Sequence, residues 1–209
     1  MSLYMLAGTN GAGKSSIGGT MIRAAGGDYF NPDEAARQIA EANPGASIAE
    51  ANSAAWLEGK RLLERAIAER GNFAFETTLG GRTLTRLLAD AIEDGIDVHM
   101  WYVALASPEL HLARVRARVS RGGHDIPEHQ VRRRYDASRH NLLELLHGLA
   151  SLRVYDNSAD ADPAAGTAPA PELILHMERG RILHHCELAT APEWGKPILL
   201  TALEEPPAR

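Results

Sequence analysis

One segment near the N-terminus limits the fold of this chain more than any other. Residues 8–15 read Gly-Thr-Asn-Gly-Ala-Gly-Lys-Ser, which matches the glycine-rich loops that bind nucleoside triphosphates. The apolar run 3–7 precedes the segment and is typical of a buried parallel strand. Residues 16–23 are expected to form a helix. Because strand, glycine-rich loop and helix are the context that this motif requires, we expect an α/β fold of the P-loop NTPase class.

The residue types of this loop suit a triphosphate. Glycines allow backbone N–H groups to turn around phosphate oxygens without Cβ clashes. We expect Lys14 to face solvent in the empty loop and to hold the β- and γ-phosphates of ATP, while the Ser15 hydroxyl ligates Mg²⁺. A glycine-rich turn that binds no ligand is the alternative, and the lysine, the hydroxyl and the context argue against it. The residues predicted to bind the nucleotide are Gly8, Asn10, Gly11, Ala12, Gly13, Lys14, Ser15 and Ser16.

The composition suits one such domain. With 209 residues, 44% of them hydrophobic, the chain can build a sizeable core with a possible appendage. The formal net charge of −5 gives no general attraction to nucleic acid or to membranes. Cys186 is the only cysteine, which excludes an intrachain disulfide and suits a reducing compartment. Since the sequence shows neither a signal peptide nor a membrane-spanning stretch, we expect a cytoplasmic protein.

Beyond the loop, the pattern alternates as in a doubly wound sheet. Strands are expected at 28–30, 72–76, 97–103 and 152–155, and helices at 32–42, 46–70, 83–94, 108–121 and 128–146. Two apolar runs around 178–181 indicate a hairpin, and the last dozen residues are expected to form an unstructured tail. We therefore predict a mainly parallel central sheet flanked by helices. The predicted boundaries are a P-loop domain at 1–158 with a helical lid around 114–139, a linker at 159–172, and a C-terminal hairpin and tail at 173–209.

A carboxylate follows the second expected strand, in the segment Asn31-Pro32-Asp33-Glu34. Parallel strands present their carboxyl ends to the ligand. Asp33 is therefore expected near the γ-phosphate, where it could deprotonate a substrate hydroxyl or share Mg²⁺. The same residues suit a helix start, with Asn31 as N-cap and Asp33 as an acid favoured by the helix dipole. The local sequence supports both interpretations equally.

A second polar segment, Glu76-Thr77-Thr78-Leu79-Gly80-Gly81-Arg82, follows the strand expected at 72–76. It opens on the same edge of the sheet. A carboxylate and two hydroxyls can bind a substrate with many hydroxyl groups, and the adjacent glycines allow that ligand to approach closely. The alternative is a helix N-terminus capped by one of the threonines.

Arginines gather in the two helices of the expected lid. Arg114, Arg118 and Arg121 are spaced i, i+4 and i+7, which places them on one helix face. A guanidinium group binds phosphate oxygens in a bidentate manner, and Gly122-Gly123 provides a hinge for closure over a triphosphate. A solvated basic face is the alternative. The whole cluster consists of Arg114, Arg116, Arg118, Arg121, Arg132, Arg133, Arg134 and Arg139.

Some residues of chemical interest are interpreted as structural. Trp56, Leu57 and Leu63 lie near helical spacing, so we predict core positions for them. His111 stands on an expected helix without metal-ligand partners, which favours a packed or solvated side chain. The run 184–186, His-His-Cys, is a poor metal site because neighbouring strand residues point to opposite faces.

Together these segments resemble the zeta toxin family of P-loop kinases, over about residues 3–158. The resemblance rests on the glycine-rich loop, on Asn-Pro-Asp-Glu, on Glu-Thr-Thr-Leu-Gly-Gly-Arg, on Arg-Gly-Gly-His-Asp-Ile-Pro with Arg-Arg-Arg-Tyr, and on Tyr-Asp-Asn-Ser at 155–158. Well-studied members of that family use ATP and Mg²⁺ to phosphorylate the 3′-hydroxyl of the sugar in UDP-N-acetylglucosamine. An antitoxin protein holds them in check.

The resemblance implies roles for individual residues. Asp33 matches the catalytic base, and Glu76 and Thr78 match positions that contact the sugar. Lid arginines are expected to neutralise the transferring phosphate. The predicted catalytic residues are Asp33, Lys14, Arg118 and Arg121, and the predicted substrate contacts are Glu76, Thr78, Arg82 and Arg134.

The sequence thus favours an ATP-dependent kinase whose acceptor is a small molecule such as a nucleotide sugar, with a possible antitoxin partner. Other functions stay open, both among kinases and among proteins that are not kinases. The acceptor could be another metabolite or a nucleotide, or the chain could be a nucleotide-gated interaction protein with weak ATPase activity. A polynucleotide 5′-kinase would use the arginines to bind a nucleic-acid backbone, and the acidic net charge argues against it.

Overall fold

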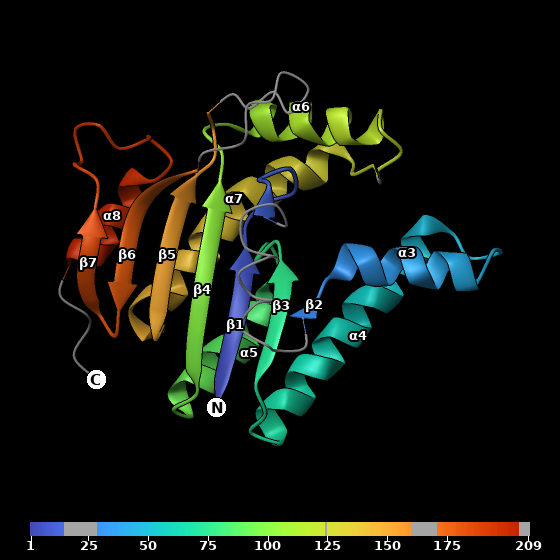
Figure 1. The fold of residues 1–209 in the computed structure, drawn as a ribbon, viewed down its shortest axis with the longest axis horizontal. Helices are drawn as coiled ribbons and strands as arrows, with labels where there is room; N and C mark the ends of the chain where they lie inside the picture. The colour runs from blue at the N-terminus through green and yellow to red at the C-terminus, as the bar shows by residue number, and fades with distance from the viewer. Residues whose placement is uncertain (15–28, 124, 160–170, 205–209) are drawn as a thin grey trace.

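A single mixed sheet forms the centre of the molecule (Figure 1). The computed structural model describes residues 1–14, 29–123, 125–159 and 171–204, and within them seven strands are ordered β2-β3-β1-β4-β5-β6-β7. Strands β2, β3, β1, β4 and β5 run parallel, while β6 and β7 are antiparallel to their neighbours. The strands are β1 Ser2–Ala7, β2 Tyr29–Phe30, β3 Phe73–Thr77, β4 Asp97–Ala104, β5 Ser151–Asp156, β6 Glu172–Glu178 and β7 Arg181–His185. The predicted mainly parallel sheet is confirmed.

Helices connect the parallel strands. Figure 1 shows α5, α7 and α8 behind the sheet, α6 above the carboxyl ends of the strands, and α3 and α4 beside β2. The helices are α3 Pro32–Ala42, α4 Ile48–Ala68, α5 Arg82–Glu93, α6 Pro108–Val119, α7 Glu128–Leu145, the 3₁₀-helix η1 Leu146–Gly148 and α8 Lys196–Leu203. The helix expected at 16–23, with Ser15 and Ser16, lies outside the described residues, as does most of the expected linker.

The core lies between the sheet and the helices behind it. In β4, Val98, Met100 and Tyr102 are buried, whereas the residues between them are partly exposed. The buried set packs in one cluster with Leu88 of α5 and Leu142 of α7. This period-2 pattern fixes which face of the sheet meets the helices.

The C-terminal hairpin continues the central sheet, because β6 pairs with β5 from Ser151 to Asp156. Its turn contains Arg179 and Gly180, with φ of 48° and 75°, as a tight hairpin turn requires. The expected unstructured tail is wrong up to Leu203, because α8 extends over these residues. Ile198 and Leu199 are buried in the main core, and this burial stabilises the helix.

The second helix of the expected lid is fixed to the body of the protein along its C-terminal half. The Tyr102 hydroxyl donates to Ser138 Oγ at 3.1 Å. Asn141 Nδ2 donates to the carbonyl oxygen of Leu79 at 2.7 Å. Helix α7 therefore forms part of the core and presents only its first turns toward the P-loop.

Two buried side chains from other parts of the chain form hydrogen bonds with the backbone of the P-loop. Asn157, just after β5, donates through Nδ2 to the carbonyl oxygen of Ala12 at 2.8 Å. His111 of α6 is fully buried, and its Nδ1 lies 2.8 Å from the carbonyl oxygen of Asn10. Because a carbonyl accepts, Nδ1 carries the proton of this imidazole. Of the packed and solvated roles expected for His111, the structure shows the packed one, and the contact supports the loop.

His111 makes the stability of the protein dependent on pH. Burial lowers the pKa of this imidazole to about 4, against the opposing effect of the Asn10 hydrogen bond, and the cations Lys14, Arg114 and Arg139 lower it further. The unfolded chain therefore binds a proton at His111 at higher pH than the folded chain does. The contribution of His111 to the free energy of unfolding is therefore complete above about pH 6.5 and is lost as the pH falls toward 4.

We predict that His111→Asn, which keeps a donor near Nδ1 but cannot titrate, reduces this dependence. Between pH 7 and pH 5 the wild type should lose about 2 kcal/mol more unfolding free energy than the variant. Urea unfolding at both pH values measures the difference. Parallel curves for the two proteins would show that His111 does not titrate across this range.

Candidate active site

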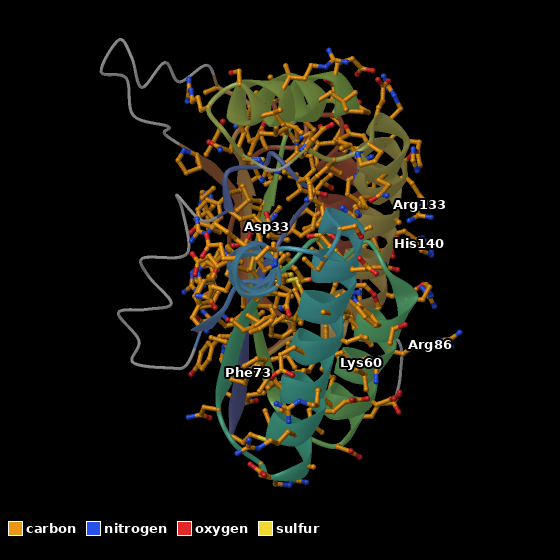
Figure 2. All side chains as sticks on the ribbon, turned by 90° about the vertical axis from the view of Figure 1, so that its right-hand side faces the viewer. Asp33, Lys60, Phe73, Arg86, Arg133 and His140 are labelled. Atoms are coloured by element: carbon orange, nitrogen blue, oxygen red, sulfur yellow. The ribbon has the colours of Figure 1, made fainter. Side chains whose placement is uncertain are left out.

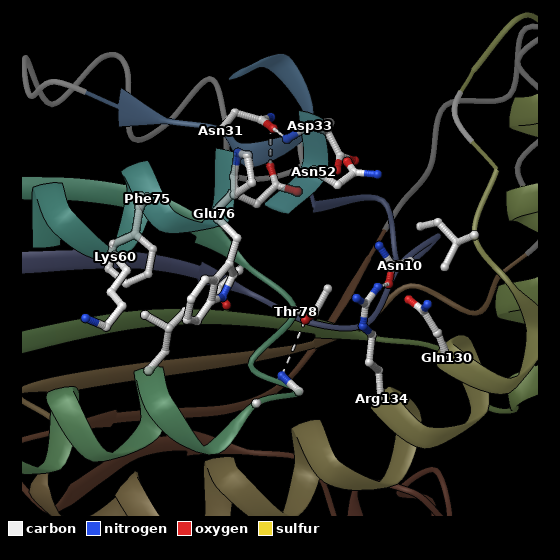
Figure 3. A pocket seen from close by; sticks show the side chains of 18 of the residues that line it. Asn10, Asn31, Asp33, Asn52, Lys60, Phe75, Glu76, Thr78, Gln130 and Arg134 are labelled. Carbon is white, nitrogen blue, oxygen red and sulfur yellow. Dashed lines mark hydrogen bonds between the residues drawn. The ribbon is translucent and has the colours of Figure 1, made fainter. Parts of the chain in front are cut away.

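A cavity of about 640 Å³ opens at the carboxyl ends of β1, β2 and β3. The P-loop, the start of α3, the end of β3, one side of α4 and the first turns of α7 line it (Figure 3). This is the edge where open α/β sheets bind their ligands. The predicted site residues that line it are Asn10, Lys14, Asp33, Glu76, Thr78 and Arg134.

The backbone of the P-loop has the curvature of an anion-binding loop. Gly8, Gly11 and Gly13 have φ of 137°, 82° and 87°, which only glycine adopts at low cost. A Cβ on Gly8 would lie 2.0 Å from the carbonyl oxygen of Val103. The sequence of this loop thus follows from its conformation and from its close contact with β4.

Lys14 is buried, so the expectation of a solvent-facing side chain is wrong. Its Nζ donates to the carbonyl oxygen of Gly8 at 2.7 Å and lies 3.5 Å from Glu76 Oε1. The side chain of Lys14 is 7% exposed and that of Glu76 is 11% exposed. A buried ammonium needs such partners, and phosphate oxygens could take the same positions around Nζ.

Glu76 is held by three donors from two segments of the chain. Besides Lys14 of the P-loop, the Tyr29 hydroxyl donates to Oε2 at 2.7 Å and Asn31 Nδ2 donates to Oε2 at 3.3 Å. These contacts join the ends of β1, β2 and β3. Glu76 was predicted from sequence to contact the substrate, and the structure adds its contact with the lysine of the phosphate-binding loop.

The segment after β2 begins helix α3 and also lines the cavity. Asn31 is the N-cap of α3, since its Oδ1 accepts from the backbone N–H of Asp33 at 2.9 Å and of Glu34 at 3.3 Å. Asp33 leaves the capping to Asn31 and lines the cavity instead. Its Oδ2 lies 3.4 Å from Nη1 of Arg118, which crosses from α6.

Arg134 is the arginine of the expected lid that lines the cavity. Its Nη1 donates to Asn10 Oδ1 at 2.8 Å, and its side chain packs against Gly80, where a Cβ would lie 2.8 Å from Cγ. Burial lowers the pKa of its guanidinium group. Among the residues that the structure describes, no carboxylate forms an ion pair with Arg134. An anion in the cavity would provide that missing partner.

Other arginines of the cluster are placed differently. Arg121 is exposed and does not line the cavity, and Arg133 is exposed on the outer side of α7 (Figure 2). Arg114 donates to the carbonyl oxygen of Asn157 at 2.7 Å. Arg82 contacts Glu144 and Asn141 of α7 instead of the cavity, so its predicted substrate contact receives no support from the geometry.

Sequence reasoning missed the wall that α4 contributes. Ile48, Asn52, Trp56 and Lys60, four residues apart, all line the cavity, and Trp56 is 42% exposed. The core positions predicted for Trp56 and Leu57 are therefore wrong, while Leu63 is buried as predicted. Asn52 and Lys60 share this helix face with Trp56 and could have indicated its position from the sequence, since a helix face that packs against the core would not carry polar residues.

The described residues contain neither a cluster of metal-binding side chains nor a membrane-spanning helix. No group of three or more His, Cys, Asp and Glu side chains in these ranges lies close enough to hold a metal ion. Ser15, the predicted Mg²⁺ ligand, is not among them. None of the described helices is long and apolar enough to cross a membrane.

Solved structures share this architecture. The AvrRxo1-ORF1:ORF2 complex, determined with ATP, superposes with a TM-score of 0.67 at 16% identity, covering 96% of this chain and 63% of that one. The chain thus spans less than two thirds of that protein. The PezAT toxin–antitoxin system of Streptococcus pneumoniae gives a TM-score of 0.54 at 16% identity, covering 81% and 73%. These likenesses support the P-loop fold.

Sequence comparisons give the family. An uncharacterized protein of Haemophilus influenzae strain Rd is 35% identical over 128 residues, which covers 61% of this chain and 88% of that protein. The sequence profile of the zeta toxin family matches residues 2–162, which include every cavity-lining residue. The chain therefore belongs to the zeta toxin family of P-loop kinases.

Proposed function

We propose that this protein transfers the γ-phosphoryl group of ATP to a hydroxyl group of a small molecule, with a nucleotide sugar such as UDP-N-acetylglucosamine as the first candidate. One observation carries the proposal. Lys14 and Arg134 share one cavity with Asp33, and that cavity extends along α4 with room for an acceptor.

The residues on the P-loop side fit a triphosphate. Three glycines with positive φ curve the loop, Lys14 supplies a cation, and Arg134 brings a guanidinium group with no carboxylate paired to it in the described part of the chain. Phosphate oxygens would join Glu76 as partners of Lys14 Nζ. The structure of the AvrRxo1 complex with ATP supports this choice of donor.

Mg²⁺ would bind with the nucleotide and would neutralise charge on its phosphates. Hard oxygen ligands are those that Mg²⁺ prefers. Asp33 and Glu76 supply carboxylates to the cavity, and Ser15, outside the described residues, is the proposed hydroxyl ligand. The donor set therefore suits the ion.

Asp33 is the proposed base for the acceptor. The acceptor oxygen attacks the γ-phosphorus while the bond to the β–γ bridging oxygen breaks, so that ADP leaves and Asp33 takes the hydroxyl proton. Arg118 now pairs with Asp33 at 3.4 Å. We propose that it turns to the γ-phosphate when ATP binds, which releases the carboxylate for the acceptor.

The acceptor would lie between the end of β3 and α4. Thr78 can contact hydroxyl groups there, and the half-exposed Trp56 offers an aromatic face to a base. Lys60, now 2.6 Å from Glu64 Oε1, supplies a cation on the same wall for a diphosphate. A base, a diphosphate and a sugar are the three parts of a nucleotide sugar, and this wall has a side chain suited to each of them.

A protein partner of the antitoxin kind is also proposed. The PezAT and AvrRxo1 structures are described as toxin–antitoxin and two-protein systems. Ile48, Trp56 and Leu57 are exposed apolar residues on α4, the first two line the cavity, and such patches mark interaction surfaces. Action in the cytoplasm, where ATP is available, completes the proposal.

Mass spectrometry of a metabolite extract incubated with the protein and ATP tests the proposed function. The expected result is one nucleotide sugar that gains a phosphoryl group only when ATP and the protein are both present. A different metabolite as product would keep the kinase chemistry and replace the acceptor. ATP turnover that no acceptor accelerates would favour a nucleotide-gated interaction protein.

We predict that Lys14→Met lowers phosphoryl transfer about a thousandfold, because the variant lacks the cation that would stabilise the charge of the transferring phosphoryl group. It should also lower the unfolding midpoint, since the carboxylate of Glu76 stays buried without its cation. Adding Glu76→Gln should restore much of the midpoint without restoring transfer. Near-normal transfer by Lys14→Met would refute the role of Lys14.

Asp33→Asn should lower transfer about a hundredfold or more while ATP binding persists, because only the proton acceptor is removed. Glu34→Gln is the matched control, since it removes a charge from the same first turn of α3. The control should cost about 0.3–1 kcal/mol of stability and leave transfer unchanged. Equal effects of the two substitutions in transfer and unfolding assays would assign Asp33 to the helix dipole alone.

Arg134→Gln should lower kcat by about 10²–10³ with a smaller effect on ATP affinity, because charge on the transferring group is stabilised mainly in the transition state. Arg121→Gln removes the same charge from an exposed position outside the cavity and should retain wild-type kcat. Steady-state kinetics of both variants checks this. A loss confined to Arg121→Gln would show that the lid rearranges to bring Arg121 to the nucleotide.

A further inference from the structure

Asn31 uses both ends of its side-chain amide at the centre of the site. The residue is 7% exposed. Its Oδ1 accepts the two N–H groups that begin α3, at 2.9 and 3.3 Å, and its Nδ2 donates to Glu76 Oε2 at 3.3 Å. Figure 3 shows Asn31 between Asp33 and Glu76.

The surroundings allow only one orientation of this amide. A flipped side chain would place its oxygen against the carboxylate of Glu76 and its NH₂ group against the N–H groups of Asp33 and Glu34. Capping alone does not require asparagine, because aspartate and serine cap helices equally well. The amide is needed for the second contact, where only a donor can serve a carboxylate.

This second contact connects the two halves of the proposed reaction. Through its cap, Asn31 fixes the backbone of Asp33, which would receive the acceptor proton. Through Glu76, whose Oε1 lies 3.5 Å from Lys14 Nζ, it reaches the cation that would bind the γ-phosphate. Misplacing two reacting groups by about 1 Å can cost a hundredfold in rate.

We propose that Asn31 is a positioning residue that holds Asp33 in register with the Glu76–Lys14 pair. Its catalytic consequence rests on the proposed function. The energetic coupling between Asn31 and Glu76 does not depend on the proposed function. The role exceeds capping, because it requires the donor end of the amide.

The test exchanges the two partners of the hydrogen bond. Asn31→Asp keeps the cap but places a second carboxylate against Glu76. Asn31→Ser keeps the cap and adds no charge, but its shorter side chain draws its one donor, the hydroxyl, away from Glu76. Both should lower kcat about tenfold to a hundredfold with little change in the KM for ATP.

When Asn31→Asp is combined with Glu76→Gln, the new amide can donate to the new carboxylate, which reverses the direction of the hydrogen bond. In that background Asn31→Asp should cause no further fall in kcat or in the urea midpoint.

Additive effects of the two substitutions in kcat and in unfolding would overturn the proposal, because they would show that Asn31 acts without Glu76. Wild-type kcat in both Asn31 variants would overturn it as well. If the wild type transfers phosphate to no acceptor, the proposed function fails on its own. The unfolding cycle for positions 31 and 76 then still decides whether Asn31 and Glu76 are coupled.

Discussion

The buried pairing of Lys14 with Glu76 is the interaction on which the site depends. Two charges withdrawn from water cost several kcal/mol each unless other groups complete their coordination. Lys14 therefore also donates to the Gly8 carbonyl, and Glu76 accepts from Tyr29 and Asn31. Satisfying one ion pair thus joins the ends of three strands. These contacts hold Lys14 at the end of the P-loop and Glu76 at the end of β3 without a ligand.

Helices α6 and α7 contact the same loop at Asn10. Arg134 of α7 donates to the side chain of Asn10, and His111 of α6 contacts its backbone oxygen. The two helices share a small apolar cluster that includes Val115 and Val131, so they pack as a unit. Thr9 of the loop also donates through its hydroxyl to the carbonyl oxygen of Arg134 at 3.3 Å. Helices α6 and α7 are therefore joined to the P-loop by hydrogen bonds at two consecutive residues, Thr9 and Asn10.

The sequence predicted the fold well because its signals are local. Apolar runs, glycine breaks and helix caps reproduce most strand and helix boundaries to within two residues. Contacts between distant segments left no such signal. Arg82 pairs with Glu144, far along the chain, and nothing local indicates it. Trp56 was misassigned because helical spacing shows which residues share a face and does not show whether that face meets a core or a cavity.

The segment from Asn31 to Glu34 serves as a helix cap and as part of the cavity wall. Asn31 caps α3, and the carboxylate of Asp33 lies on the cavity side, where the proposed base would stand. The residues proposed to bind phosphate lie in short motifs at strand ends, whereas the proposed acceptor wall consists of Ile48, Asn52, Trp56 and Lys60, which form no motif. On this proposal, relatives that keep the motifs but change these four positions would keep the donor chemistry and select a different acceptor.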